Sequence, residues 1–110
     1  MKRIMAPLLV VLLWAAAGQA PAQETEAYLK GKAIAQQICS ECHAIRKDQI
    51  RSPNGLAPTF EEVATTPGMT ALALTAALRT SHPAMPNLIL SDDQLRGIIA
   101  YITSLRPDVR

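Results

Sequence analysis

The sequence predicts an all-α domain, and three observations carry this prediction. Apolar residues recur at the 3.6-residue spacing of one helix face in two long segments. Residues that cap helix N-termini stand directly before the helical segments, and stretches rich in proline separate these segments. No segment shows the alternating pattern typical of a β-strand. The elements expected are two longer helices with two shorter ones between them.

The first 22 residues are predicted to be a signal peptide and not part of this domain. Residues 2 and 3 are basic, residues 4–17 are apolar, and an Ala-Pro-Ala sequence allows cleavage near Ala22/Gln23. The apolar run is shorter than the roughly 20 residues of a membrane-spanning helix, so no stable membrane insertion is expected after cleavage. A retained N-terminal anchor is the alternative. The domain expected is residues 23–110, exported to the periplasm.

The charge of the expected mature chain argues against nucleic-acid binding, and its low aromatic content indicates that the core needs additional support. The sequence has 11 basic and 9 acidic residues, and Lys2 and Arg3 belong to the predicted signal peptide, so the mature chain is near neutral. Such a chain offers no basic surface for nucleic acids, and no nucleic-acid partner is expected. Its aromatic residues are only Tyr28, Phe60 and Tyr101. A domain this small is therefore expected to need a disulfide, a metal or a large cofactor to complete its core.

The first helix is expected to begin at Thr25 as its N-cap, in the segment "TEAYLKGKAIAQQIC". Its predicted buried face consists of Ala27, Gly31, Ile34, Ala35 and Ile38. Two shorter helices are expected next. One covers "FEEVA", capped by Thr59 and Glu62, and the other covers about residues 70–80 with Leu74 and Leu78 on one face.

The last helix has the strongest pattern, in "LSDDQLRGIIAYITSLR". Ser91 and Gln94 form a capping box, and the acidic pair between them suits the N-terminal end of the helix dipole. A buried stripe follows, made of Leu95, Ile98, Ile99, Ile102 and Leu105. Pro107 ends the helix. The segments "RSPNGLAP" and "SHPAMPNLIL" are expected to be loops.

The segment "QQICSECHAIRK" carries the chemistry. Cys39 and Cys42 stand three positions apart, and His43 follows directly, which is the attachment motif of c-type haem. Two thiols at this spacing can each form a thioether with a vinyl group of one porphyrin edge. The next residue then offers an imidazole to the iron from the same side. We therefore expect one covalently attached haem c, with His43 as the proximal ligand.

The two cysteines have three alternative interpretations. A thioredoxin-like dithiol needs a strand–helix setting that the sequence does not predict. A zinc site could take His82 as its fourth ligand, but Cys42 and His43 are adjacent and poorly placed to bind one ion together. A plain disulfide would leave His43 without a role.

The ligand at the sixth position of the iron decides the function. A tightly held protein ligand makes an electron carrier, whereas an open position permits oxygen or peroxide chemistry. The candidates are Met69, His82 and Met85. Met85 is favoured because Pro83 and Pro86 stiffen the loop around it. His82 is the alternative, since imidazole binds iron strongly, and Met69 is expected to be an apolar filler.

The chain resembles a small bacterial class I (monohaem) cytochrome c over nearly all of its mature length. The resemblance lies in "GKAIAQQICSECH", "APTFEEVA", "AMPNLILSDDQL" and "IIAYITSL", which occur in the family's order. It implies about four helices wrapped around one haem c, attached at Cys39 and Cys42, with His43 and Met85 as axial ligands.

The resemblance also implies roles for positions outside the motif. Gly31 corresponds to a first-helix glycine against which an aromatic of the last helix packs, here Tyr101. A proline carbonyl accepts the Nδ1–H of the proximal histidine in the family; Pro58 suits this role, with Pro53 as the alternative. Ala35 departs from the family, in which an aromatic is frequent.

The function expected is that of a periplasmic one-electron carrier and not an enzyme, shuttling between redox enzymes as a monomer. Redox protein donors and acceptors are expected to dock at the exposed haem edge. We hypothesise that six basic residues rim a docking surface for an acidic partner. These are Lys30, Lys32, Arg46, Lys47, Arg51 and Arg79. The alternatives are a haem enzyme or gas sensor with a weak or displaceable sixth ligand, and a cytochrome subunit of a larger dehydrogenase.

Overall fold

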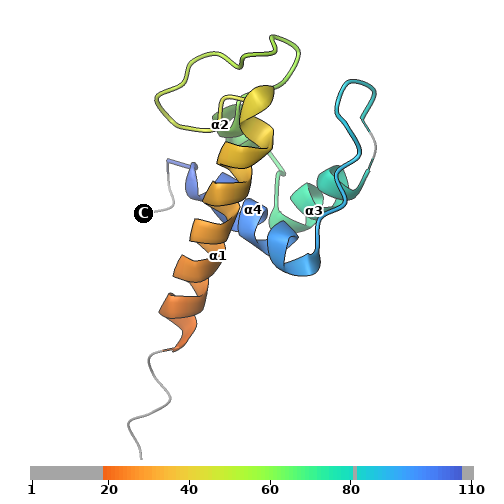
Figure 1. The fold of residues 1–110 in the computed structure, drawn as a ribbon. Helices are drawn as coiled ribbons and strands as arrows, with labels where there is room; N and C mark the ends of the chain where they lie inside the picture. The colour runs from red at the N-terminus through yellow and green to blue at the C-terminus, as the bar shows by residue number, and fades with distance from the viewer. Residues whose placement is uncertain (1–18, 81, 108–110) are drawn as a thin grey trace, which may run out of the picture.

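A computed structural model describes residues 19–80 and 82–107. In this part of the chain the structure is helical and has no strands, which confirms the predicted all-α class. The elements in chain order are α1 (Gln19–Gln37), the 3₁₀ helix η1 (Cys39–Glu41), α2 (Phe60–Thr65), α3 (Ala71–Arg79) and α4 (Asp92–Ser104). Figure 1 shows α1 crossing α4, with a long loop between η1 and α2 at one end of α1.

Helix α1 begins earlier than the sequence pattern indicated. It starts at Gln19, so Thr25 lies inside the helix and the prediction of Thr25 as its N-cap is wrong. Pro21 does not prevent this start, because the backbone N–H groups of a first helical turn have no intrahelical acceptors to lose. The predicted cleavage point near Ala22/Gln23 falls within this helix, and residues 1–18 of the predicted signal peptide lie outside the described residues. Among the described helices, none is both long and apolar enough to span a bilayer.

The crossing of α1 and α4 depends on two glycines. A Cβ atom on Gly31 would lie 1.8 Å from the carbonyl oxygen of Gly97 and 2.9 Å from the backbone nitrogen of Ile98. The backbones of the two helices therefore touch at this point, and no side chain fits between them. The resemblance implies that Tyr101 packs against Gly31; the atoms nearest to a Cβ at Gly31 belong to the backbone of Gly97 and Ile98.

Side chains cap the three later helices, and the caps of α2 and α4 are those predicted. Thr59 and Glu62 form a capping box on α2, and Ser91 and Gln94 form one on α4. Thr70 accepts a hydrogen bond from the backbone N–H of Ala73 at the start of α3. These residues satisfy N–H groups that a helix leaves without partners, so each helix begins at the residue its cap dictates.

The core lies where α1, α2 and α3 meet α4. Most of the predicted stripe on α4 is buried, with Ile99 only partly so. Ala35 is completely buried on α1, whereas Ile38 is 42% exposed. The loop after η1 joins this core through Ala44 and Ile45, and the hydroxyl of Tyr101 donates to the carbonyl of Ile45 at 2.7 Å.

Candidate functional site

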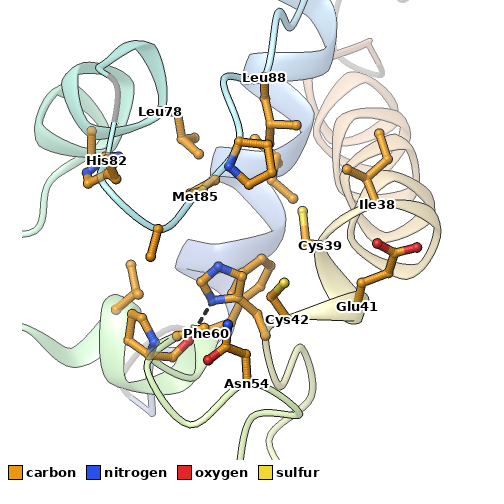
Figure 2. Close-up of a pocket in the computed structure, with 18 of the residues that line it drawn as sticks. Ile38, Cys39, Glu41, Cys42, Asn54, Phe60, Leu78, His82, Met85 and Leu88 are labelled. Carbon is orange, nitrogen blue, oxygen red and sulfur yellow. Dashed lines mark hydrogen bonds between the residues drawn. The ribbon is translucent and has the colours of Figure 1, made fainter.

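A cavity of about 430 Å³ opens between η1, α2, α3 and the loop before α4. This size lies in the range of about 300–1,000 Å³ that is usual for small-molecule and cofactor sites. Its walls are mainly apolar, with Phe60, Val63, Leu74, Leu78, Ile98 and Ile102 among the lining residues. Figure 2 shows Cys39, Cys42 and Met85 around this space, with Leu78 and Leu88 beside Met85.

The cysteines reach the cavity because the chain tightens into η1 directly after α1. The backbone N–H groups of Cys42 and His43 both donate to the carbonyl of Cys39, at 3.2 and 2.9 Å. Both cysteines are free thiols and both line the cavity. Burial raises the pKa of the Cys39 thiol to about 11. A redox-active dithiol needs a lowered thiol pKa. The raised pKa of Cys39 therefore argues against a thioredoxin-like role.

His43 is held by the backbone on the far side of the motif. Its Nδ1 lies 2.7 Å from the carbonyl oxygen of Pro58. Because a carbonyl only accepts, Nδ1 carries a proton, and Nε2 is the ring nitrogen placed to bind a metal. The ring also contacts the buried Phe60, with the ring centroids 5.4 Å apart. The imidazole is thereby fixed both in tautomer and in orientation.

The capping box of α2 supports this contact. Thr59 follows Pro58 directly, and its side chain accepts from the N–H of Glu62 at 3.0 Å. The Glu62 carboxylate in turn accepts from the N–H of Thr59 at 2.7 Å. The backbone N–H of Phe60 donates to the carbonyl of Ala44, next to His43. These bonds hold the Pro58 carbonyl at a set position relative to the histidine.

Met85 and His82 enter from the loop between α3 and α4. The N–H of Met85 donates to the carbonyl of His82 at 3.2 Å, which closes a tight turn containing Pro83. Met85 is partly buried and His82 is exposed, and both line the cavity. Met69 does not: it packs against the core near α2 and lines a separate hollow beside Arg106. The structure thus brings two of the three candidate sixth ligands to the site.

The residues at the cavity fit a covalently attached haem. Two thiols, the His43 and His82 imidazoles and one thioether line a single space whose remaining walls are largely apolar. A porphyrin needs such walls, and haem iron takes imidazole and thioether as axial ligands. Cys39 and Cys42 could hold the ring, and His43 with Met85 or His82 could hold the iron. Among the described residues, no group of three or more His, Cys, Asp or Glu side chains could hold a metal ion by itself.

Sequence reasoning missed several residues of the site. The sequence predicts Phe60 only as the first residue of a short helix, but in the structure its ring lies against the ring of His43. Leu56 and Glu41 line the cavity and are exposed, yet nothing in their sequence spacing marks them. Conversely, none of the six basic residues of the hypothesised rim lines the cavity. Arg46 and Arg79 instead pair with Asp48 and Asp92, at 3.2 and 2.9 Å.

Comparison with known proteins identifies the family of the chain. The family described as "Cytochrome C oxidase, cbb3-type, subunit III" matches residues 26–102. Cytochrome c-552 of Bradyrhizobium diazoefficiens is 35% identical over 77 residues, which is 70% of this chain and 73% of that protein. No solved structure matches the chain significantly. The matched region begins within α1 and ends near the C-terminus of α4. The chain belongs to this family of c-type cytochromes and is a small monohaem cytochrome c, an electron-transfer protein with covalently bound haem c.

Proposed function

We propose that the protein is a one-electron carrier in which Cys39 and Cys42 hold the haem, with His43 and Met85 as the axial ligands. One observation carries this proposal. A histidine whose Nδ1 is engaged by the Pro58 carbonyl shares one apolar cavity with two thiols and a thioether. With Cys39 and Cys42 used for attachment and with His43 and Met85 at the two axial positions, no position on the iron would be left for a substrate. No bond of a substrate is made or broken, and the protein is not an enzyme.

The bound haem supplies an iron that gains or loses one electron. The protein sets the conditions for that change. The bond from Nδ1 of His43 to Pro58 fixes the ring and makes Nε2 a better donor. The Met85 thioether favours the ferrous state relative to a second imidazole, which raises the reduction potential. The apolar walls favour the ferrous state as well, because the oxidised centre carries one more positive charge.

The carrier role includes export and transient docking. We propose that the signal peptide is cleaved near Ala22/Gln23 and that the mature monomer shuttles in the periplasm between redox proteins. The basic, apolar and Ala-Pro-Ala pattern of the N-terminus supports export. The open cavity supports electron exchange at its mouth, because exposed residues such as Leu56 line it.

A second candidate is an electron-transfer subunit within a larger redox enzyme. The description of the matching family, which names an oxidase subunit, favours it. The site chemistry would be the same, and only the partner would be permanent. Purification of the native protein separates the two. A carrier elutes as a monomer, whereas a subunit elutes at constant ratio with a defined oxidase or dehydrogenase activity.

The ligand set is tested by substitution in the haem-loaded protein. We expect Met85→Ala to open the sixth position, so that the ferrous protein binds carbon monoxide rapidly and its potential falls. His82→Ala should leave the spectrum and the potential unchanged. Met69→Ala is the matched control, because Met69 lies outside the cavity. If His82→Ala opens the site and Met85→Ala does not, His82 is the ligand. Rapid binding of carbon monoxide by the unmodified protein would indicate a gas sensor or haem enzyme.

A further inference from the structure

The loop between α3 and α4 carries His82 and Met85, and an ion pair joins the two helices at its ends (Figure 1). The guanidinium of Arg79, the last residue of α3, donates to Oδ1 of Asp92, the first residue of α4, at 2.9 Å. Within the described part of the chain, no other ion pair joins two helices. The pair therefore ties the base of the segment that brings Met85 to the cavity.

Little packing holds the end of α3 against the rest of the domain. Leu74 is the buried residue of this nine-residue helix, and Leu78 is only partly buried. Beyond Leu78, the backbone N–H of Thr80 donates to the carbonyl of Ala77 at 3.4 Å, which is long for such a bond. Few buried apolar contacts are typical of a segment that opens locally without global unfolding. The last turn of α3 is thus a place where an additional contact matters.

Asp92 lies on a firmer element. The capping box of Ser91 and Gln94 fixes the first turn of α4, and Leu95, which follows directly, is buried. Each charge of the pair also suits its helix end, because a cation is favoured at a C-terminus and an anion at an N-terminus. The pair can therefore hold the weakly packed end of the loop at a set distance from the firm end.

We propose that Arg79 and Asp92 are positioning residues for the sixth ligand, because their ion pair holds the loop where the Met85 thioether can bind the haem iron. The inference rests on the proposed ligation by His43 and Met85 and concerns what maintains it. While the pair is formed, the loop ends cannot separate, so the loop has fewer conformations to enter once Met85 leaves the iron. The two side chains are 59% and 78% exposed, so the effect is modest and is screened by salt.

Imidazole binding to the ferric holoprotein measures how often Met85 leaves the iron. The Fe–S bond breaks, a nitrogen of imidazole bonds to the iron in its place, and no electron is transferred. At about pH 8 free imidazole is mainly uncharged, so salt does not act on the entering ligand. At low imidazole concentration, the second-order rate constant is proportional to the fraction of molecules in which Met85 is dissociated. At about 10 mM ionic strength, Arg79→Gln and Asp92→Asn should each raise this rate constant about threefold.

Two further readouts separate the ion pair from a general change of charge. The double variant Arg79→Gln/Asp92→Asn should be no faster than Arg79→Gln, because the second substitution removes a contact that is already lost. Near 1 M salt, where the screening length falls to about 3 Å, the wild type should approach the rate of the variants. Arg96→Gln is the matched control and should bind imidazole at the wild-type rate. Arg96 pairs with Asp93 within α4 at similar exposure, 68% and 65%, and that pair does not span the loop.

The outcomes distinguish the inference from the ligation on which it rests. Equal rates for Arg79→Gln and Arg96→Gln at low salt would overturn the inference and leave the ligand set standing. Rate increases that multiply in the double variant would overturn it as well, since the two residues would then act separately. If Met85→Ala binds imidazole no faster than the wild type, Met85 is not the displaced ligand. The proposed ligation then fails, and the inference fails with it.

Discussion

At the scale of single residues, the site depends on how neighbouring groups restrict His43. Its Nδ1 is engaged by a backbone carbonyl, and its ring lies against Phe60. Phe60 in turn contacts Tyr101, with ring centroids 6.4 Å apart, and Tyr101 contacts Tyr28 at 5.6 Å. The phenylalanine and the two tyrosines of the chain thus form a continuous series of ring contacts that ends at the histidine. A chain with so few aromatic residues places them where ring orientation affects the cofactor.

Tyr101 provides a test of this series through its ionisation. Burial raises the pKa of its phenol, with a smaller contribution from Tyr28. A folded-state pKa above the unfolded value of about 10 means that its stabilisation is complete below pH 10. This stabilisation is lost as the pH rises through the folded value. At neutral pH, Tyr101→Phe should lower the free energy of unfolding by about 1–3 kcal/mol, because the Ile45 carbonyl loses its donor.

The test is urea unfolding of the holoprotein at increasing pH. The difference in stability between the wild type and Tyr101→Phe should shrink above about pH 10, since only the wild type loses the phenol proton. Tyr28→Phe is the control, because it keeps the hydrogen bond to Ile45. A difference that stays constant up to about pH 11 would show that the pKa of Tyr101 is not raised in the folded protein.

At the scale of elements, the crossing of α1 and α4 sets the frame of the site. We predict that Gly31→Ala lowers the free energy of unfolding by about 3 kcal/mol or more, because its methyl group would meet the Gly97 backbone. Gly97→Ala should cost less, since its methyl group would lie 3.0 Å from backbone atoms of α1. Gly55→Ala is the control, with no atom within 4 Å, and should change stability by less than about 0.5 kcal/mol. Denaturant titration measures this order, and a cost for Gly31→Ala near that of Gly55→Ala would refute the contact.

The helix caps give a pair of variants with different effects on the haem. Thr59→Ala and Ser91→Ala each remove one capping box and should each cost about 1 kcal/mol. Only Thr59 adjoins the carbonyl that holds His43. Thr59→Ala should therefore weaken the hydrogen bond from Nδ1, reduce donation to the iron and raise the midpoint potential. Equilibrium redox titration of both variants measures this. Equal potentials would show that the α2 cap does not support the histidine.

Helix caps and periodic stripes could be predicted from the sequence because both are local patterns. Thr59, Thr70 and Ser91 begin the helices where expected, and the α4 stripe is buried. The start of α1 could not be predicted, because the residues before Thr25 also tolerate a helix and no stop signal separates them. The contact of Gly31 with Gly97 was missed as well. It depends on how closely two helices approach, and spacing along one helix does not encode that distance.

At the scale of the whole molecule, the cavity explains why a chain with few aromatic residues can fold. The side chains around this opening of about 430 Å³ are largely apolar and would face water unless a cofactor covered them, and burial of apolar surface is worth roughly 25 cal/mol per Å². The haem is thus part of the core. The thiol, imidazole and thioether donors could be predicted from the motif and the resemblance. The position of Leu56 in the cavity wall could not be predicted, because it depends on how the loop after η1 folds back toward the cavity.

This view predicts that the fold depends on haem attachment. A Cys39→Ala/Cys42→Ala chain produced without haem should lose cooperative thermal unfolding and its near-ultraviolet circular dichroism. Ser40→Ala is the control, because Ser40 lies between the cysteines and leaves the attachment motif intact. A cooperative transition in the haem-free variant at the temperature of the wild type would mean that the polypeptide core suffices.

The central claim, that haem iron in this cavity is bound by His43 and Met85, is tested most directly by the proton NMR spectrum of the ferrous holoprotein. A methionine methyl group bound over the porphyrin face is strongly shielded by the ring current. We predict one such three-proton resonance far upfield, present in the wild type and in His82→Ala and absent in Met85→Ala. A wild-type spectrum without it, or its persistence in Met85→Ala, would contradict the proposed ligand set.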